Sequence, residues 1–180
     1  MGPRGELEDW VRPKVEAWVH RVRILAKIAK WYTQSAYAGL GMLLQLDWQY
    51  LQRTFPGVVS LMGPVEESLR EVFLPTLFGG EEVSADLRKI LGQSVKRGSL
   101  GIPDPGLSEE RAYNTSKSAS KVLVSSLLVG TKLKYVTHKG CVRRASDYKR
   151  KQRELADKAM ILRRKELADW SELNRLWRST

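Results

Sequence analysis

The stretch from Ser35 to Pro56 constrains the fold more than any other part of the chain, because its apolar residues recur at helical spacing. Six of them follow steps of one, three and four: Ala36, Leu40, Leu43, Leu44, Trp48 and Leu51. This spacing places them on one face of a helix. Pro56 ends the helix, since proline disfavours a helical conformation at the residue before it. We therefore predict a central core helix over this stretch.

Two glycines, Gly39 and Gly41, lie inside this predicted helix. Each costs about 1 kcal/mol in a helix interior. They are tolerable where another helix packs against them at close range. An amphipathic helix is also predicted over residues 6–31, where a heptad-like seam runs along Val11, Val15, Trp18, Val22, Leu25 and Ala29. Pro13 favours a start of that helix near residue 12.

Further helices are predicted along the rest of the chain. Pro64 opens a third helix, which Pro75 breaks, and Ser84 is a plausible N-cap for a short helix up to residue 95. Two more helices are predicted over residues 108–129, with Gly130 as the stop, and over residues 142–177. The chain of 180 residues is 42% hydrophobic, which can supply a real core. The predicted fold class is all-α, an irregular bundle of about five helices with a long basic C-terminal helix.

The stretch from Lys96 to Gly106 is too rich in glycine and proline for a helix. Gly98 and Gly101 allow backbone conformations that other residues avoid. Leu100 and Ile102 alternate as the residues of a short extended segment do. A phosphate-binding loop is not indicated, because the Lys-Ser/Thr that ends a P-loop is missing.

The formal charge of +11 is concentrated in one short segment. Residues 1–131 carry 16 Lys/Arg and 14 Asp/Glu, whereas residues 132–165 carry 13 and 3. This asymmetry suggests an anionic partner. It also divides the chain into a predicted bundle, residues 1–131, and a basic segment with the long helix, residues 132–180. The predicted nucleic-acid-binding residues are Lys96, Arg97, Lys132, Lys134, Lys139, Arg143, Arg144, Lys149, Arg150, Lys151 and Arg153.

No catalytic apparatus, cofactor site or metal site is indicated by the sequence. His138 and Cys141 have half of a zinc-site spacing, but a second pair of ligands is missing. The single cysteine fits a reducing compartment. The acidic N-terminus does not resemble a signal peptide, and the longest uncharged stretch, residues 31–46, is too short to span a bilayer. We expect an intracellular protein of the nucleus or cytoplasm, neither secreted nor in a membrane.

Several short motifs occur in an order that resembles a known family. These are Gln34-Ser-Ala-Tyr-Ala-Gly, Asp47-Trp-Gln-Tyr-Leu-Gln-Arg-Thr, Pro64-Val-Glu-Glu, Phe73-Leu-Pro-Thr-Leu-Phe-Gly and Lys96-Arg-Gly-Ser-Leu-Gly-Ile-Pro-Asp-Pro. The order resembles the region downstream of the polymerase palm in reverse-transcriptase-like retrotransposon proteins. The resemblance covers residues 11–155. It implies a thumb-like helical region that grips a template–primer duplex.

The resemblance does not extend to the chemistry. The polymerase site of that family needs Tyr/Phe-x-Asp-Asp and a further Asp to hold two metal ions, and the sequence contains no such motif. The resemblance therefore implies a non-catalytic fragment that holds nucleic acid without polymerising it.

Two functions remain open from the sequence. The first is a module that binds the backbone of RNA, DNA or a hybrid with little sequence preference, in which Tyr135 and Tyr148 either stack on bases or pack on the core. The second is a protein-interaction or scaffold module. It would dock through an apolar stripe of the C-terminal helix that consists of Leu167, Trp170, Leu173 and Trp177.

Overall fold

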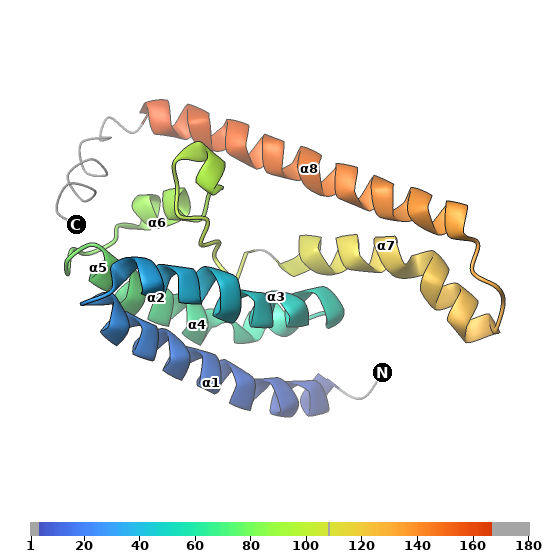
Figure 1. Cartoon of the computed structure of the whole chain (residues 1–180), viewed down its shortest axis with the longest axis horizontal. Helices are drawn as coiled ribbons and strands as arrows, with labels where there is room; N and C mark the ends of the chain where they lie inside the picture. Colours follow the sequence, from blue (N-terminus) through green and yellow to red (C-terminus); the bar gives the residue numbers. More distant parts are fainter. Residues whose placement is uncertain (1–3, 108, 167–180) are drawn as a thin grey trace.

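The computed structural model describes residues 4–107 and 109–166, and within these ranges every regular element is a helix (Figure 1). The all-α prediction is confirmed. The elements, with η for π- and 3₁₀-helices, are α1 (Arg4–Ala29), α2 (Thr33–Gly39), η1 (Leu40–Leu44), α3 (Gln45–Thr54), η2 (Val58–Leu61), α4 (Gly63–Ser68), η3 (Leu69–Phe73), α5 (Leu74–Leu77), α6 (Ala85–Leu91), η4 (Val95–Arg97), α7 (Glu109–Val129) and α8 (Tyr135–Glu166).

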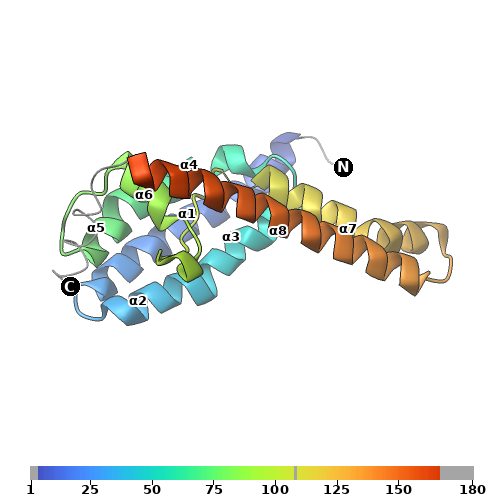
Figure 2. The same cartoon turned by 90° about the horizontal axis from the view of Figure 1, so that it is seen from above.

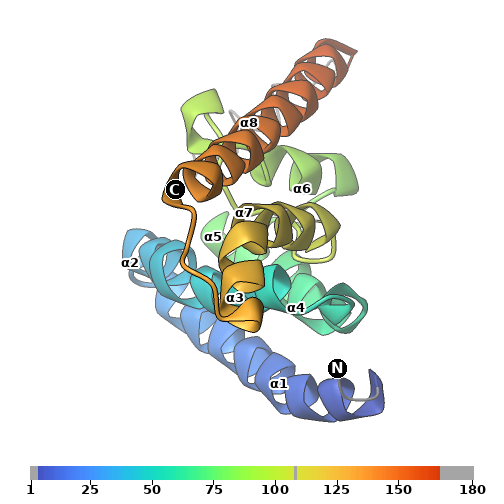
Figure 3. The same ribbon diagram turned by 90° about the vertical axis from the view of Figure 1, so that its right-hand side faces the viewer.

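The elements from α1 to α6 form the bundle, and α7 and α8 form a long hairpin along one side of it. In Figures 1 and 3, α1 and α8 lie at opposite edges of the molecule. The hairpin joins the bundle where α7 packs on α3. The predicted division of the chain at residue 131 stays a prediction, since α7 contacts both α3 and α8.

The predicted seam of α1 forms one wall of the core. Val11, Val15, Trp18, Val22 and Ala29 are buried, and Leu25 is half-buried. The predicted start near residue 12 is wrong, because α1 begins at Arg4 and runs through Pro13. Asp9 and Pro13 both lie on the exposed side of the helix. The carbonyl that loses its helical hydrogen bond to the proline therefore faces water.

The central helix is confirmed as a continuous run of α2, η1 and α3. Five of its six predicted core residues are buried, and Trp48 meets the Trp18 ring edge-on at 6.2 Å between centroids. The prediction for the sixth residue, Leu43, is wrong, because its side chain is 71% exposed. A π-helical turn, η1, contains one more residue than an α turn and so shifts the apolar face at this point.

The two glycines of this helix differ in their surroundings. A Cβ on Gly39 would lie 3.1 Å from Cδ2 of Leu25, so another helix packs closely here, and that helix is α1. A Cβ on Gly41 would meet nothing within 4 Å.

A second continuous helix consists of α4, η3 and α5. Pro64 lies in its first turn, as predicted. The predicted break at Pro75 is wrong, because the helix continues to Leu77. The π-helical turn η3, directly before the proline, changes the hydrogen-bond register and accommodates its missing N–H. In the next helix, the hydroxyl of Ser84 accepts a hydrogen bond from the Leu87 N–H, which confirms the predicted cap of α6. This helix ends at Leu91, four residues earlier than predicted.

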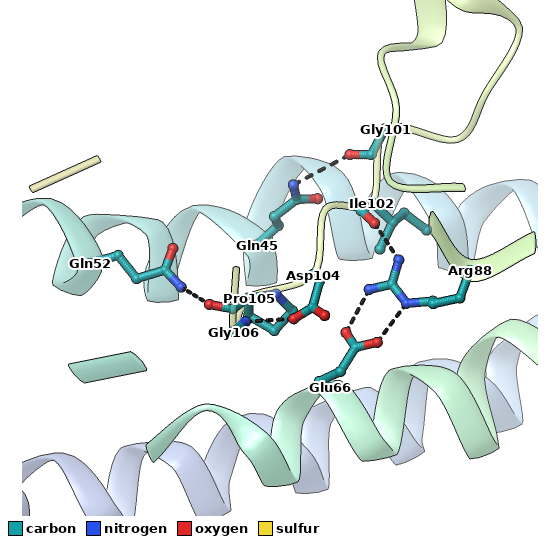
Figure 4. Close-up of polar contacts among 9 residues, drawn as sticks. All are labelled: Gln45, Gln52, Glu66, Arg88, Gly101, Ile102, Asp104, Pro105 and Gly106. Atoms are coloured by element: carbon teal, nitrogen blue, oxygen red, sulfur yellow. Dashed lines mark hydrogen bonds and ion pairs between the residues drawn. The ribbon is translucent and has the colours of Figure 1, made fainter. Parts of the chain in front are cut away.

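Residues 99–105, here called the strap, cross the bundle without regular secondary structure (Figure 4). The prediction of a non-helical segment over residues 96–106 holds from Gly98 on, whereas Lys96 and Arg97 lie in the 3₁₀-helix η4. The unusual backbone conformations predicted for Gly98 and Gly101 are confirmed by φ values of 73° and 67°. Ile102 of the strap is buried in the core.

The backbone of the strap is held mainly by side chains of the surrounding helices. The Tyr37 hydroxyl donates to the Leu100 carbonyl, and Gln45 Nε2 donates to the Gly101 carbonyl at 3.4 Å. Gln52 Nε2 donates to the Pro105 carbonyl at 2.7 Å, and Arg88 Nη1 to the Ile102 carbonyl at 2.7 Å (Figure 4). These donors satisfy carbonyl groups that a sheet would otherwise pair.

Arg88 also makes a two-pronged ion pair with Glu66 of α4. Arg88 Nε and Nη2 lie 2.7 Å and 2.6 Å from the two carboxylate oxygens, and the Arg88 side chain is 7% exposed. Burial raises the pKa of Glu66 above its ordinary value. The hydrogen bonds and the positive charge of Arg88 oppose that rise. Arg88 thus connects α6, α4 and the strap.

We expect Arg88→Met to lower the free energy of unfolding by about 3–5 kcal/mol, because it leaves a half-buried carboxylate and a buried carbonyl without their partner. Urea unfolding monitored by circular dichroism measures this loss. The double variant Arg88→Met/Glu66→Leu should be more stable than Arg88→Met alone, since it removes the unpaired carboxylate. The matched control is Lys89→Met, which removes an exposed pair with Asp86 and should cost less than about 1 kcal/mol. Equal losses at positions 88 and 89 would contradict this account.

Candidate nucleic-acid interface

The α7–α8 hairpin carries most of the predicted binding residues. The two helices run antiparallel, side by side, and a short turn over residues 130–134 joins them (Figures 1 and 2). Gly130 has a φ of 69° and ends α7, as predicted, and the Thr131 N–H donates to the Ser126 carbonyl at 3.0 Å. Ser108, predicted as the start of this helix, lies outside the described residues.

The second helix of the hairpin begins seven residues earlier than predicted, at Tyr135 instead of 142. The His138 N–H donates to the Lys134 carbonyl at 3.0 Å and closes the first turn. Gly140 costs about 1 kcal/mol in this turn region, and packing of α8 on α7 offsets that cost. Extending the helix to Tyr135 brings Lys139 onto its surface.

One face of α8 is packed and the rest is open. The packed face consists of residues spaced by three, four and seven positions that are buried or half-buried and face α7: His138, Cys141, Ala145 and Gln152. The predicted cations lie on the remaining surface, and all seven of those on α8 are exposed. Lys132 and Lys134 are exposed in the turn at the tip.

The cations of α8 follow two lines. Residues 139, 143, 146, 150 and 153 are spaced by alternating steps of four and three, so they lie in one line along the helix. Four of these five positions are cations, and we call them the first row: Lys139, Arg143, Arg150 and Arg153. A second row consists of Arg144, Lys151 and Lys158, at seven-residue spacing. Lys149, four residues before Arg153, lies beside the first row.

The distal hairpin has no internal source of negative charge. From Arg111 to Ser146 the sequence contains eight Lys/Arg and no Asp or Glu. Among the described cations of both rows, Arg150 has two carboxylates within ion-pair distance, Asp147 at 3.0 Å and Glu154 at 3.9 Å. The positive charge of the hairpin is therefore largely available to an external anion.

The bundle adds a cation that the sequence did not reveal. The pKa of Lys149 is lowered from its ordinary value, first by burial and then by the positive charges of Arg153 and Arg53. Arg53 lies in the last turn of α3, far from Lys149 in the sequence. Only the packing of the hairpin against the bundle brings these charges together, so no local motif could have predicted it.

Lys96 and Arg97 are on a different element from the other predicted residues. They lie in η4, directly before the strap, and Lys96 is exposed there. The hydroxyl of Ser94 accepts a hydrogen bond from the Lys96 N–H at 3.3 Å. The family-like motif at residues 96–105 thus belongs to the bundle, whereas the remaining nine cations belong to the hairpin.

The tip of the hairpin combines cations with exposed apolar side chains. More than half of each of the following side chains is exposed: Leu127, Leu128, Val129, Tyr135 and Val136. Tyr148 is also 53% exposed, so packing of Tyr135 and Tyr148 on the core is excluded. The predicted protein-docking stripe, with Trp170 and Trp177, lies outside the described residues.

Other kinds of site find little support in the described part of the chain. No group of three or more His, Cys, Asp or Glu residues there is arranged to hold a metal ion. His138 and Cys141 share the packed face of α8, and Arg144 Nη2 lies 3.2 Å from the Cys141 sulfur. No helix in residues 4–107 and 109–166 is both long and apolar enough to cross a membrane. Comparisons with protein-family models, curated proteins and solved structures found no match.

We expect Arg153→Gln and Arg53→Gln each to raise the pKa of Lys149 toward its ordinary value, because each removes a nearby positive charge. The rise should be larger for Arg153→Gln. A pH titration of the lysine side-chain NMR signals measures both shifts. Arg12→Gln, on the exposed side of α1, is the control and should leave the signal of Lys149 unchanged. An unchanged pKa in Arg53→Gln would show that α3 and α8 are farther apart than described.

Proposed function

We propose that this chain is a non-catalytic nucleic-acid-binding module whose α7–α8 hairpin holds the phosphate backbone. The observation that carries the proposal is the hairpin with its two rows of exposed cations and with no Asp or Glu from Arg111 to Ser146. Backbone phosphates are the anions that such a surface meets along a line. Lys and Arg side chains supply most contacts of this kind in known complexes.

The length of the first row suits a nucleic-acid strand. Lys139 and Arg153 are fourteen residues apart, which corresponds to about 21 Å along a helix. One strand of a B-form duplex presents a phosphate about every 3.4 Å along its axis, so about six phosphates fit along the row. Lys149 and Arg53 extend the positive surface toward the bundle.

The second row faces another direction from the first. Arg144, Lys151 and Lys158 therefore cannot contact the same stretch of backbone as Lys139 and Arg153. We assign the first row, with Lys149, to the main contact, because the bundle adds Arg53 only on that side. The second row is free for another strand or for solvent.

The proposed contacts give little sequence preference. Phosphate contacts position a protein on a duplex but do not distinguish bases. Tyr135 and Tyr148 are exposed and supply flat rings for stacking, which also tolerates any base. RNA, DNA and hybrid ligands are all compatible with this chemistry.

The order of motifs supports kinship with the post-palm region of reverse-transcriptase-like retrotransposon proteins, and we include that kinship in the proposal. The chain lacks the Tyr/Phe-x-Asp-Asp motif, so the proposal assigns it no polymerase activity. A nucleic-acid partner places its action inside the cell, in the nucleus or the cytoplasm.

A protein-interaction module is the second candidate. The observation that favours it is the apolar tip of the hairpin, where Leu128 and Val136 are 82% and 84% exposed. Large exposed apolar groups of this kind mark protein interfaces more often than nucleic-acid contacts. A partner protein of this type would be acidic, since Lys132 and Lys134 flank the tip.

We expect the full chain to bind a fluorescent 20-base-pair duplex with a strong salt dependence. If six cations contact phosphates, log K falls against log salt with a slope of about −5. The triple variant Lys139→Gln/Arg143→Gln/Arg153→Gln should reduce the slope by up to about 3, because each contact contributes about 0.9. Fluorescence anisotropy across a salt series measures both slopes.

The matched control is Arg12→Gln/Arg23→Gln/Lys30→Gln, which removes the same charge from exposed positions of α1. It should leave the slope of the full chain unchanged. A flat salt response of the unaltered chain would overturn the proposal and favour the protein-interaction module. An equal effect of both triple variants would show that binding depends on net charge and not on the hairpin.

We also expect a random-sequence panel of duplexes to bind within about threefold of one another, since no side chain is assigned to base edges. Competition of unlabelled duplexes against one labelled probe measures this spread. A tenfold preference for one sequence would require base contacts and would contradict the backbone-only interface.

A further inference from the structure

The tip of the α7–α8 hairpin presents a cluster of five apolar side chains to solvent. Leu127, Leu128 and Val129 belong to the last turn of α7, and Tyr135 and Val136 begin α8. These residues are 66–84% exposed. The hairpin projects beyond the bundle, so the cluster lies at an outer end of the molecule (Figures 1 and 2). The tip is therefore the convex end of a projecting arm, with its apolar groups in water.

The charges at the tip are all positive. Lys132 and Lys134 lie in the turn between the two halves of the apolar cluster, and both are exposed. From Arg111 to Ser146 the sequence contains no Asp or Glu, so an anionic surface meets no local acid as it approaches the tip. The long stem of a lysine lets its charge stay at a polar boundary while neighbouring apolar groups enter a nonpolar phase.

We propose that the tip inserts into the surface of an anionic lipid bilayer and attaches the protein there peripherally. The aliphatic side chains enter the acyl boundary, Tyr135 lies at the level of the headgroups, and the two lysines bind anionic headgroups. The backbone of the turn is suited to this place. The N–H groups of Gly130 and Thr131 donate to the carbonyls of Leu127 and Ser126 at 3.4 Å and 3.0 Å, which lowers the cost of taking them out of water.

Two other partners fit the tip less well. A nucleic-acid strand gains little from Leu and Val side chains, which neither pair with phosphates nor stack on bases. An acidic protein, the partner in the second candidate function, needs a hollow that matches the convex tip. A bilayer is fluid and needs no matching hollow. Cytoplasmic leaflets are rich in anionic lipids, so the proposal agrees with the expected intracellular location. It does not rest on the proposed nucleic-acid function, which uses the first row.

Flotation of the full chain with lipid vesicles tests the proposal. We expect binding to vesicles of phosphatidylcholine and phosphatidylserine at about 7:3, and at least about tenfold weaker binding to pure phosphatidylcholine. Leu128→Ser/Val136→Ser should weaken binding to the anionic vesicles at least about tenfold, because two aliphatic groups no longer enter the lipid. The matched control is Met42→Ser/Leu43→Ser, which removes two exposed apolar side chains from η1 and should keep the binding of the unaltered chain.

The same variants separate the proposal from its alternatives. Absence of binding to the anionic vesicles would overturn it. If Leu128→Ser/Val136→Ser bound as tightly as the unaltered chain, the cations alone would cause adsorption, and insertion of the tip would be excluded. Loss of binding to immobilised poly-glutamate in this variant, in a chain that binds no vesicles, would identify an acidic protein as the partner instead. The variant should keep its helical circular dichroism and its affinity for the 20-base-pair duplex, so failure of either proposal is visible separately.

A fluorescent label tests insertion directly in a Cys141→Ser background. Leu128→Cys carrying the environment-sensitive dye NBD should brighten and shift to shorter wavelength when anionic vesicles are added, because the dye leaves water. The same dye on Met42→Cys should not respond, since η1 lies in the bundle. An equal response at both positions, or none at position 128 in a vesicle-bound chain, would overturn insertion of the tip.

Discussion

The structure depends on how its helices donate hydrogen bonds to the backbone of an irregular segment that passes between them. The strap has no neighbouring strand, so its carbonyls need other donors. Tyr37, Gln45 and Gln52 from the central helix supply three, and Arg88 from α6 supplies a fourth. Because Arg88 also binds Glu66, this small set of polar side chains fixes α6, α4 and the strap relative to one another. The apolar core surrounds the set and excludes water, which makes each donor costly to lose.

The placement of charge follows from this arrangement. The bundle pairs or balances its charges, with Glu66 against Arg88 and Asp47 against Arg21. The packed face of α8 contains His138, Cys141 and Ala145, so the predicted cations of this helix lie on its exposed surface. A compact, nearly neutral body thus carries a projecting cationic arm. This division supports the nucleic-acid proposal more than the net charge alone, since the same charge spread evenly would give no line of contact.

The sequence predicted what depends on periodicity and missed what depends on local helix geometry. Val11, Trp18 and Trp48 are buried as their spacing indicates, and Gly130 stops α7. Leu43 is exposed because the π-helical turn changes the period on which its prediction relied. The sequence predicted a helix start near Pro13 and a helix break at Pro75, but the helices continue through both prolines. At Pro13 the carbonyl without a hydrogen-bond partner faces solvent, and at Pro75 the preceding π-helical turn accommodates the missing N–H. The positions of the first-row cations could be predicted, whereas the approach of Arg53 to Lys149 could not, because it depends on tertiary packing.

The strap also determines the order in which the chain can fold. Its carbonyls meet Tyr37, Gln45 and Gln52 across sequence separations of 63, 56 and 53 residues. Closing such loops costs entropy that local helix formation does not. The donors belong to the central helix and α6, so we expect docking of residues 99–105 to be a non-local step that follows formation of these helices. A polypeptide emerging from the ribosome therefore cannot complete its core until about residue 105 is available, by which stage the earlier helices have had time to form.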